Sequence, residues 1–298
     1  MKQKGRNFFV RRKILTFASK FKNAIHFTMD FNKVLFILQE ISPYLPDSEM
    51  GNLSRVLAQR VQEKGAEVRT FMPKYGYVND RRNQLHPVIR LSGMNLIIDD
   101  MDHPLIIKVA TLQPARLQVY FIFSDDYFTP EITKDLEINS HPDDNDERSI
   151  FYVRGVLEAV KKQRWAPGII QCSGWITALA PLYISKIYGD DPSFRDSKVV
   201  MSLFNEEMVS PLNEELYKKL KFDGFTDEDL APIMDRKASY VDLMRLALEH
   251  CHAVVQCSEN VNPEVLKLVE ESGLPFLPYQ EMEASAFADR CIEFYHSL

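Results

Sequence analysis

Long hydrophobic runs and paired cysteines are missing from this 298-residue sequence. The longest apolar runs, such as residues 34–38, are far shorter than the roughly 20 residues that cross a bilayer, so we expect no membrane anchor. The four cysteines form no C-x-x-C pair, and each lies in or beside an apolar run: Cys172, Cys251, Cys257 and Cys291. This pattern predicts buried free thiols in a reducing, cytoplasmic compartment, and neither a disulfide framework nor a metal site.

Acidic residues are absent from the first 29 positions, which carry eight basic ones. Without these eight, 28 of the 36 basic residues face all 42 acidic residues, which gives a net charge of −14. The excess of acidic residues after position 29 repels phosphate backbones, so nucleic-acid binding is not expected. We interpret the basic leader, residues 1–29, as a disordered arm or as a mis-assigned start upstream of Met29, in preference to a targeting signal.

Strand and helix patterns alternate from Lys33 onward. The short apolar run from Lys33 to Leu38 is typical of a strand buried on both faces, and a helix that stops at Gly65 precedes a second strand at residues 67–72. Such a unit implies parallel strands joined by a right-handed crossover. The same alternation continues over residues 149–204, with one helix expected at 175–188, and over residues 240–295. It predicts a doubly wound, Rossmann-like α/β fold with a mostly parallel sheet.

Residues 85–123 have a different pattern, with few helix signals and several short strands, which we expect at 88–91, 96–98, 105–110 and 118–123. We interpret them as a β-rich insertion that returns to the main sheet. The polar stretch 139–147 contains an acidic cluster and is predicted to be a solvated, exposed loop instead of a metal site. Because no repeat or linker divides the remainder, residues 30–298 are expected to form one domain.

Three segments together resemble the N-terminal catalytic domain of bacterial glycogen synthases and plant starch synthases. The first is KVLFILQEISPY at residues 33–44, which continues without gaps to PKYG at 73–76. The second is DNDER at 144–148, followed by an aromatic-rich helix, and the third is WAPGIIQCSGWITALAPLY at 165–183. Their order and spacing make the resemblance specific over about residues 33–260.

The resemblance implies one half of a GT-B architecture, in which two Rossmann-like domains face each other across a cleft. The family's reaction transfers glucose from ADP-glucose to the non-reducing end of an α-1,4-glucan. Transfer of this kind places negative charge on the departing diphosphate, which cations, glycine N–H groups and helix N-termini stabilise. The family therefore supplies a lysine and a glycine pair from the loop after its first strand.

This chain departs from the family at that loop. Pro46 stands at the lysine position, and Ser48 and Glu49 stand at the glycine pair. Gly51 remains, and Asn52 replaces a usual acidic residue. Two charges about 4 Å apart interact by about 4 kcal/mol at an effective dielectric near 20, so replacing a cation with carboxylates should prevent diphosphate binding here. The total of only 11 glycines agrees with the loss of phosphate-binding loops.

Two further motifs of the family are altered. Its His-Asp-Trp-His-Thr motif is replaced by Ser173, Gly174, Trp175, Ile176 and Thr177, so the histidine expected to contact the sugar is missing. In a later His-Asn pair, Phe204 replaces the histidine and Asn205 is kept. Nothing after Ser258 resembles the family's second, donor-binding domain.

Five residues remain as candidate substrate-binding residues, without any assigned catalytic residue or metal ligand: Asp144, Arg148, Trp175, Thr177 and Asn205. Trp175 can stack on a sugar, although we favour packing against the sheet, and Thr177 is expected to be structural. Asp144 and Arg148 match the family's Asp-Asn-x-x-Arg pattern, and they either orient a glucan or brace the following helix. Asn205 either presents its amide to a sugar hydroxyl or closes a turn.

These observations predict a glycogen- and starch-synthase-like half that is inactive alone and binds an α-glucan or a partner protein chain. A second hypothesis is an active transferase completed by a separate donor-domain chain, and a third is a small-molecule sensor that uses the remodelled cleft. No cofactor is expected, because the loop that should hold ADP-glucose, the family's donor, is altered. The sequence also allows a homodimer, since the face that meets a second domain in the family can be apolar and exposed.

Overall fold

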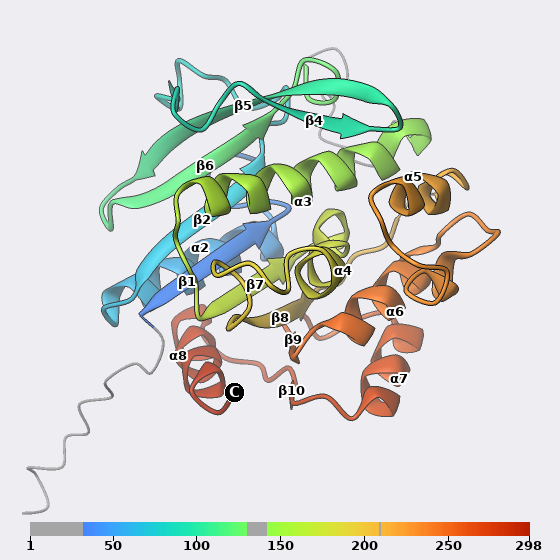
Figure 1. Cartoon of the computed structure of the whole chain (residues 1–298). Helices are drawn as coiled ribbons and strands as arrows, with labels where there is room; N and C mark the ends of the chain where they lie inside the picture. Colours follow the sequence, from blue (N-terminus) through green and yellow to red (C-terminus); the bar gives the residue numbers. More distant parts are fainter. Residues whose placement is uncertain (1–31, 130–141, 209) are drawn as a thin grey trace, which may run out of the picture. The chain divides into compact units, whose positions relative to one another are not determined.

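The computed structural model describes residues 32–129, 142–208 and 210–298. The strands are β1 (Lys33–Leu38), β2 (Glu67–Pro73), β3 (His86–Pro87), β4 (Met94–Ile98), β5 (Met101–Leu112), β6 (Leu117–Phe123), β7 (Ile169–Ser173), β8 (Lys198–Leu203), β9 (Ala253–Gln256) and β10 (Phe276–Leu277). They form one twisted sheet in the order β10-β9-β8-β7-β1-β2-β6-β5-β3, with β4 paired to β5 (Figure 1).

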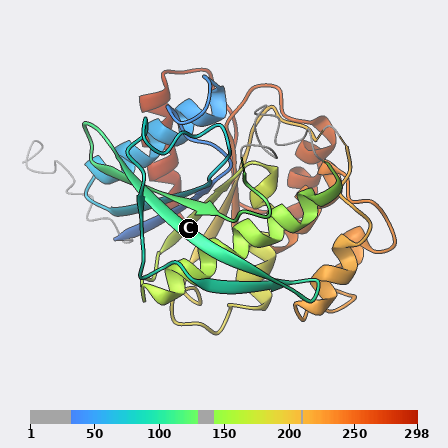
Figure 2. The same cartoon turned by 90° about the horizontal axis from the view of Figure 1, so that it is seen from above.

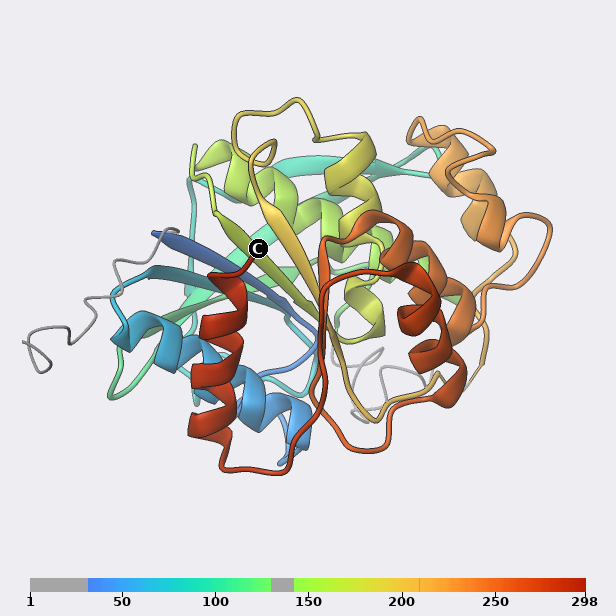
Figure 3. The ribbon, with the colours of Figure 1, turned by 90° about the horizontal axis from the view of Figure 1, so that it is seen from below.

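Helices cover both faces of this sheet. They are α2 (Glu49–Glu63), α3 (Asn145–Lys162), α4 (Ala180–Lys186), α5 (Leu216–Phe222), α6 (Tyr240–His250), α7 (Pro263–Ser272) and α8 (Ala284–Tyr295), with short 3-10 turns η1 (Pro142–Asp144), η2 (Trp175–Thr177) and η3 (Ala231–Ile233). One face carries α2 and α8, which lie side by side, and the other carries α3, α4 and α6 (Figures 1 and 3). This arrangement confirms the predicted doubly wound α/β fold.

The centre of the sheet lies at β1, which pairs in parallel with β2 on one side and β7 on the other. Residues 34–37 of this strand are fully buried, as expected for a strand covered on both faces. From β1 the strand order runs outward in both directions, so the chain reverses its direction of winding between β1 and β7. Ligands of open α/β sheets bind beside such a reversal, at the carboxyl ends of the strands.

The predicted β-rich insertion returns to the sheet through β5, which is antiparallel to β6, β3 and β4. The hairpin of β4 and β5 extends over α3 (Figures 1 and 2). A strand predicted at 88–91 is wrong, because these residues form a turn in which the Leu91 N–H donates to the Val88 carbonyl oxygen at 3.0 Å. The paired segment ends one residue earlier, at Pro87.

Two local predictions along α3 and α4 need correction. The stretch 139–147 is not a solvated loop over its described part, because η1 and the start of α3 occupy it and Asp146 is fully buried. A single helix predicted over 175–188 is divided into η2 and α4. Pro181 lies in the first turn of α4, where its missing N–H is tolerated, and this fixes the start of the second helix.

Helix ends follow the sequence closely where a cap is encoded. The Asn262 side chain accepts from the N–H groups of Glu264 and Val265 at the start of α7, and Gly273 ends this helix with φ 68°. The C-terminal helix α8 is joined to α2 by a bidentate ion pair between Asp289 and Arg60, with both N···O distances at 2.8 Å.

All four cysteines are free and buried, as predicted. Within the described ranges, no helix is long and apolar enough to cross a membrane.

Candidate functional site

The carboxyl ends of β1, β7 and β8 meet beside the reversal of strand order. The Gln39 N–H donates to the carbonyl oxygen of Ser173 at 2.8 Å, which extends the pairing of β1 with β7 by one residue. The Gln39 side chain then bridges the two other strand ends, since its Nε2 lies 3.5 Å from Glu206 and its Oε1 lies 3.5 Å from the Ile176 N–H. Gly174 has φ 92°, and a Cβ there would lie 2.3 Å from the Gln39 Cβ, so this close contact requires glycine.

The loop between β1 and α2, which should hold a diphosphate in the family, is filled by its own side chains. The Ser48 hydroxyl caps α2 by accepting from the Gly51 N–H at 2.9 Å, and it donates to the Glu40 carboxylate, also at 2.9 Å. The Ser42 hydroxyl donates to Asn52 Oδ1 at 2.7 Å. The N-terminus of α2, which is the part of a helix that attracts anions, is therefore already occupied by a serine and a carboxylate.

Carboxylates dominate the electrostatics of this edge. Burial raises the pKa of Glu40, although the Ser48 hydrogen bond opposes the shift. Burial also raises the pKa of Glu206 to about 8, and the Glu40 charge adds to this effect. Glu49 accepts from the Ser258 hydroxyl, after β9, at 2.5 Å, while Pro46 is exposed and carries no charge. The loop and the strand ends around it therefore carry carboxylates and hydroxyls, with an uncharged proline at position 46.

The altered second motif lies inside the protein. Trp175, Ile176 and Thr177 are all at most 1% exposed, so none of them can contact a ligand without a rearrangement. The Thr177 hydroxyl donates to the Gly174 carbonyl oxygen at 2.8 Å, whereas the Trp175 Nε1 is buried without a hydrogen-bond partner. In the third motif Phe204 is 3% exposed, and only Asn205 is open to solvent.

Asp144 and Arg148 lie together at the start of α3. The Arg148 guanidinium is 3% exposed and donates to the Asp144 carboxylate at 2.8 Å, to Asn145 Oδ1 at 2.9 Å and to the Tyr127 carbonyl oxygen at 3.1 Å. Burial lowers the pKa of Arg148, and the Asp144 charge opposes this. These contacts brace the first turn of α3 against the segment after β6, and they leave the Asp144 side chain 38% exposed.

A second polar group near α3 was missed by the sequence analysis. Lys219 of α5 donates to Asp146 at 2.7 Å and to Glu147 at 2.6 Å, and the Tyr127 hydroxyl donates to the other Glu147 oxygen at 2.8 Å. His103 Nε2 lies 3.0 Å from that hydroxyl. We call these five residues the Lys219 cluster. No local pattern indicates it, because its members come from β5, the segment after β6, α3 and α5.

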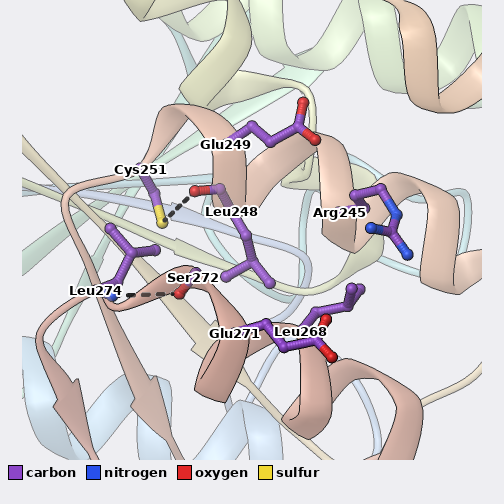
Figure 4. Close-up of a pocket in the computed structure, with 8 residues that line it drawn as sticks. All are labelled: Arg245, Leu248, Glu249, Cys251, Leu268, Glu271, Ser272 and Leu274. Carbon is purple, nitrogen blue, oxygen red and sulfur yellow. Dashed lines mark hydrogen bonds between the residues drawn. The ribbon is translucent and has the colours of Figure 1, made fainter.

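A separate hollow of about 360 Å³ lies at the opposite edge, beside the amino ends of β9 and β10 (Figure 4). The charged residues that line it are Arg245 and Glu249 from α6 and Glu271 from α7. Apolar residues, which include Leu248 and Leu268, also line it. None of the candidate substrate-binding residues lines it. Across the described ranges, no group of histidine, cysteine and acidic residues has the arrangement of a metal site.

Comparison with known proteins agrees with the resemblance. Residues 33–275 match the family model described as the starch synthase catalytic domain. A glycogen synthase of Chlorobium luteolum is 30% identical over 235 residues, which cover 78% of this chain and 47% of that protein. A glycogen synthase of Chlorobium chlorochromatii is 34% identical over 175 residues, which cover 58% of this chain and 36% of that protein.

A solved structure has the same fold. It is the catalytic domain of starch synthase IV from Arabidopsis thaliana bound to ADP and acarbose, which superimposes with a TM-score of 0.66 at 17% sequence identity. The superposition covers 85% of this chain and 52% of the plant chain, and it confirms the fold expected for one half of a GT-B enzyme. This chain thus spans about half the length of the curated relatives that it matches. Both the family model and the relatives show that the chain belongs to the starch synthase catalytic domain family.

Proposed function

We propose that this chain is a non-catalytic member of its family that binds an α-glucan or a partner protein chain. The observation that carries the proposal is the Ser48 cap of α2. Ser48 takes up the N-terminus of the helix, and the hydroxyl of Ser48 is held by the Glu40 carboxylate at 2.9 Å. A diphosphate would have to displace this contact and would meet the charges of Glu40 and Glu49.

The loss of sugar-facing groups supports the same conclusion. Ile176 and Phe204 stand where the family has histidines, and both are buried. A transferase must stabilise the charge that develops on the sugar and on the leaving diphosphate, and such stabilisation is among the largest contributions to catalysis. The side chains described at this edge are carboxylates, apolar groups and a few neutral polar groups such as Gln39, Ser48 and Asn205.

The first test is incorporation of labelled glucose from ADP-glucose into glycogen by the full chain. We expect no incorporation above a boiled control, while a glycogen synthase of Chlorobium luteolum assayed in parallel is active. Incorporation by this chain that requires Glu40 or Asn205 would show that the protein is an enzyme.

Glucan binding is tested separately, by affinity electrophoresis in gels that contain glycogen. Asp144 and Asn205 are the candidate residues that keep an exposed side chain. If the chain binds glucan at this edge, Asn205→Ala should reduce the retardation and Asn95→Ala, an exposed asparagine on β4, should not. Equal retardation of both variants and the natural chain would place glucan binding elsewhere.

A second candidate function is an active transferase completed by another chain. The observation that favours it is that the chain spans about half the length of its curated relatives. Mixing the chain with the separately produced second half of a Chlorobium glycogen synthase should then yield glucose transfer. Absence of transfer, when that half binds ADP-glucose on its own, would reject this candidate.

A further inference from the structure

His103 lies on β5, and each of its two ring nitrogens is within hydrogen-bond distance of another side chain. Nδ1 is 2.7 Å from Asp126 Oδ2, and Nε2 is 3.0 Å from the Tyr127 hydroxyl oxygen. The His103 side chain is only 8% exposed, so these two groups are its main polar surroundings. The two contacts join β5 to the segment that follows β6.

The direction of each hydrogen bond follows from the next group in the series. Glu147 accepts from the Tyr127 hydroxyl at 2.8 Å and, through its other oxygen, from Lys219 at 2.6 Å. Burial alone would raise the pKa of Glu147, but the hydrogen bonds from Lys219 and Tyr127 lower it, so this carboxylate is ionised and has no proton to donate. The single proton of the Tyr127 hydroxyl therefore lies towards Glu147, and this hydroxyl can only accept from His103.

A histidine that faces two acceptors must donate from both nitrogens. Because Asp126 accepts at Nδ1 and Tyr127 accepts at Nε2, both contacts are hydrogen bonds only in the doubly protonated, positively charged imidazolium. The Nδ1···Oδ2 distance of 2.7 Å is typical of a charge-assisted bond. In the neutral ring one nitrogen has no proton, so one of the contacts in the series from Asp126 to Glu147 must be lost.

From this geometry we propose that His103 is a pH-sensitive clip. Its charged form joins β5, the segment after β6 and the first turn of α3, and loss of one ring proton releases one of these contacts. Histidine suits such a switch, because it is the side chain that ordinarily changes charge nearest neutral pH. The inference goes beyond the proposed function, since it stands whether or not the chain binds glucan.

Acidic side chains outnumber basic ones around the clip. The titratable groups that face His103, or are connected to it through hydrogen bonds, are Asp126 and Tyr127 after β6, Asp144, Asp146, Glu147 and Arg148 from η1 and α3, and Lys219 from α5. Strand β4, which pairs with β5 beside His103, contains no titratable residue, and Asp102, the neighbour on β5, is exposed. A positive charge on the ring is therefore attracted to its surroundings, and its loss weakens the clip.

Release of the clip reaches the first turn of α3 through Tyr127. The Tyr127 carbonyl oxygen accepts from Arg148 Nε at 3.1 Å, and the Arg148 guanidinium donates to Asp144 at 2.8 Å. If Tyr127 loses its contact with either His103 or Glu147, the segment that positions this arginine is held less firmly. We therefore expect a rise in pH to increase local opening at the start of α3, while the domain stays folded.

The protonation state of the ring can be measured directly by two-dimensional ¹H–¹⁵N NMR of the labelled full chain. The signals of His103, one of seven histidines, are assigned by their absence in the His103→Gln variant. At pH 6 we expect both ring nitrogens of His103 to resonate as N–H groups, and at pH 9 we expect one of them to shift to the position of an unprotonated nitrogen. A ring with a single N–H at pH 6, or no change up to pH 9, would overturn the proposal.

Thermal unfolding measures what the clip contributes to stability. His103→Gln should lower the melting temperature by about 3–6 °C at pH 6, where the natural chain makes both bonds, and by less than half as much at pH 9. Comparing the two chains at each pH removes the effect of other titrating groups. Tyr127→Phe, which removes the link to Glu147, should show the same convergence. His86→Gln, an exposed histidine on β3, is the matched control and should leave the melting temperature unchanged at both pH values.

Hydrogen exchange at a fixed pH of 7 tests whether the release reaches α3. In His103→Gln the amides of residues 149–152, in the second turn of α3, should exchange about threefold faster or more than in the natural chain. The amides of α7 should exchange at the same rate in both chains. Equal losses of melting temperature at both pH values, or unchanged exchange in α3, would show that His103 only fills space and would overturn the proposal.

Discussion

Carboxylates gather at two places in this domain, the Lys219 cluster and the carboxyl edge that carries Glu206 and Glu207, and the two differ in what accompanies them. In the cluster, Asp146 and Glu147 each receive a hydrogen bond from Lys219. At the carboxyl edge, Glu206 accepts a hydrogen bond from Gln39 at 3.5 Å and Glu207 accepts one from Asn262 at 3.4 Å, and neither forms an ion pair with a basic residue among the described residues. A buried carboxylate with a lysine fastens one element to another, whereas one without a cation costs stability.

The largest effect is expected from removing the cation of the cluster. Lys219→Ala leaves Asp146 fully buried without its ion-pair partner, so the free energy of unfolding should decrease by about 3–5 kcal/mol. Urea unfolding of the variant measures this loss. Lys218→Ala is the neighbouring control, because this lysine is 70% exposed and its pair with Glu215, which water screens, should contribute little to stability. Equal losses in both variants would remove the distinction between the two regions.

The rigidity of the carboxyl edge can be tested at Gly174. An alanine there meets the Gln39 Cβ at 2.3 Å and also keeps a positive φ, so Gly174→Ala should destabilise the protein by about 2–4 kcal/mol. Gly93→Ala has a similar φ of 78° but nothing within 4 Å of the added Cβ, and its loss should be about 1 kcal/mol. Thermal or urea unfolding compares them, and matching losses would show that the Gln39 contact is loose.

The raised pKa of Glu206 predicts a pH-dependent loss of stability. Its pKa is raised to about 8 in the folded chain, whereas an unfolded glutamate titrates near 4.3. The folded state therefore binds more protons between these values, and stability should fall as the pH rises from about 4.5 to 8. Glu206→Gln removes this contribution.

We expect the Glu206→Gln variant to gain about 1–3 kcal/mol over the natural chain at pH 8 and much less at pH 5, because water screens part of the shift at a partly exposed side chain. Urea unfolding at both pH values measures the difference. A pH-independent difference would mean that Glu206 is already ionised in the folded chain.

The smallest effect is expected at the α2 cap. Ser48→Ala removes the acceptor for the Gly51 N–H and the donor to Glu40, so the free energy of unfolding should decrease by about 1 kcal/mol. Ser48→Asp keeps the cap but places a second carboxylate beside Glu40, and it should recover little of that loss. Full recovery would indicate that the loop tolerates, and does not avoid, added negative charge.

Several features of the fold were predictable because they depend on short stretches of chain. The run at residues 33–38 is apolar throughout, which requires burial on both faces, and Asn262, Pro263 and Gly273 mark the two ends of α7. The division of the helix after β7 was less clear, since Pro181 is compatible both with a continuing turn and with a new helix.

The candidate site was predictable only in part. The replacement of the family's lysine by Pro46 can be predicted from the sequence alone. The roles of Trp175 and Thr177 depend on burial, and the structure leaves at most 1% of either residue exposed. The acidic stretch before α3 was predicted to be solvated, because its charges were visible and their partner Lys219, 73 positions later than Asp146, was not.

The sequence by itself determined the alternation of strands and helices along most of the chain, the two ends of α7 and the loss of cationic and glycine positions after β1, because each depends on neighbours in the chain. Only the tertiary structure decided which carboxylates are paired. Parallel strands bring their carboxyl ends to one edge, so Gln39 and Glu206 meet although 167 positions separate them. The packing of α5 decides which carboxylates receive a lysine, and it brings Lys219 to Asp146 and Glu147.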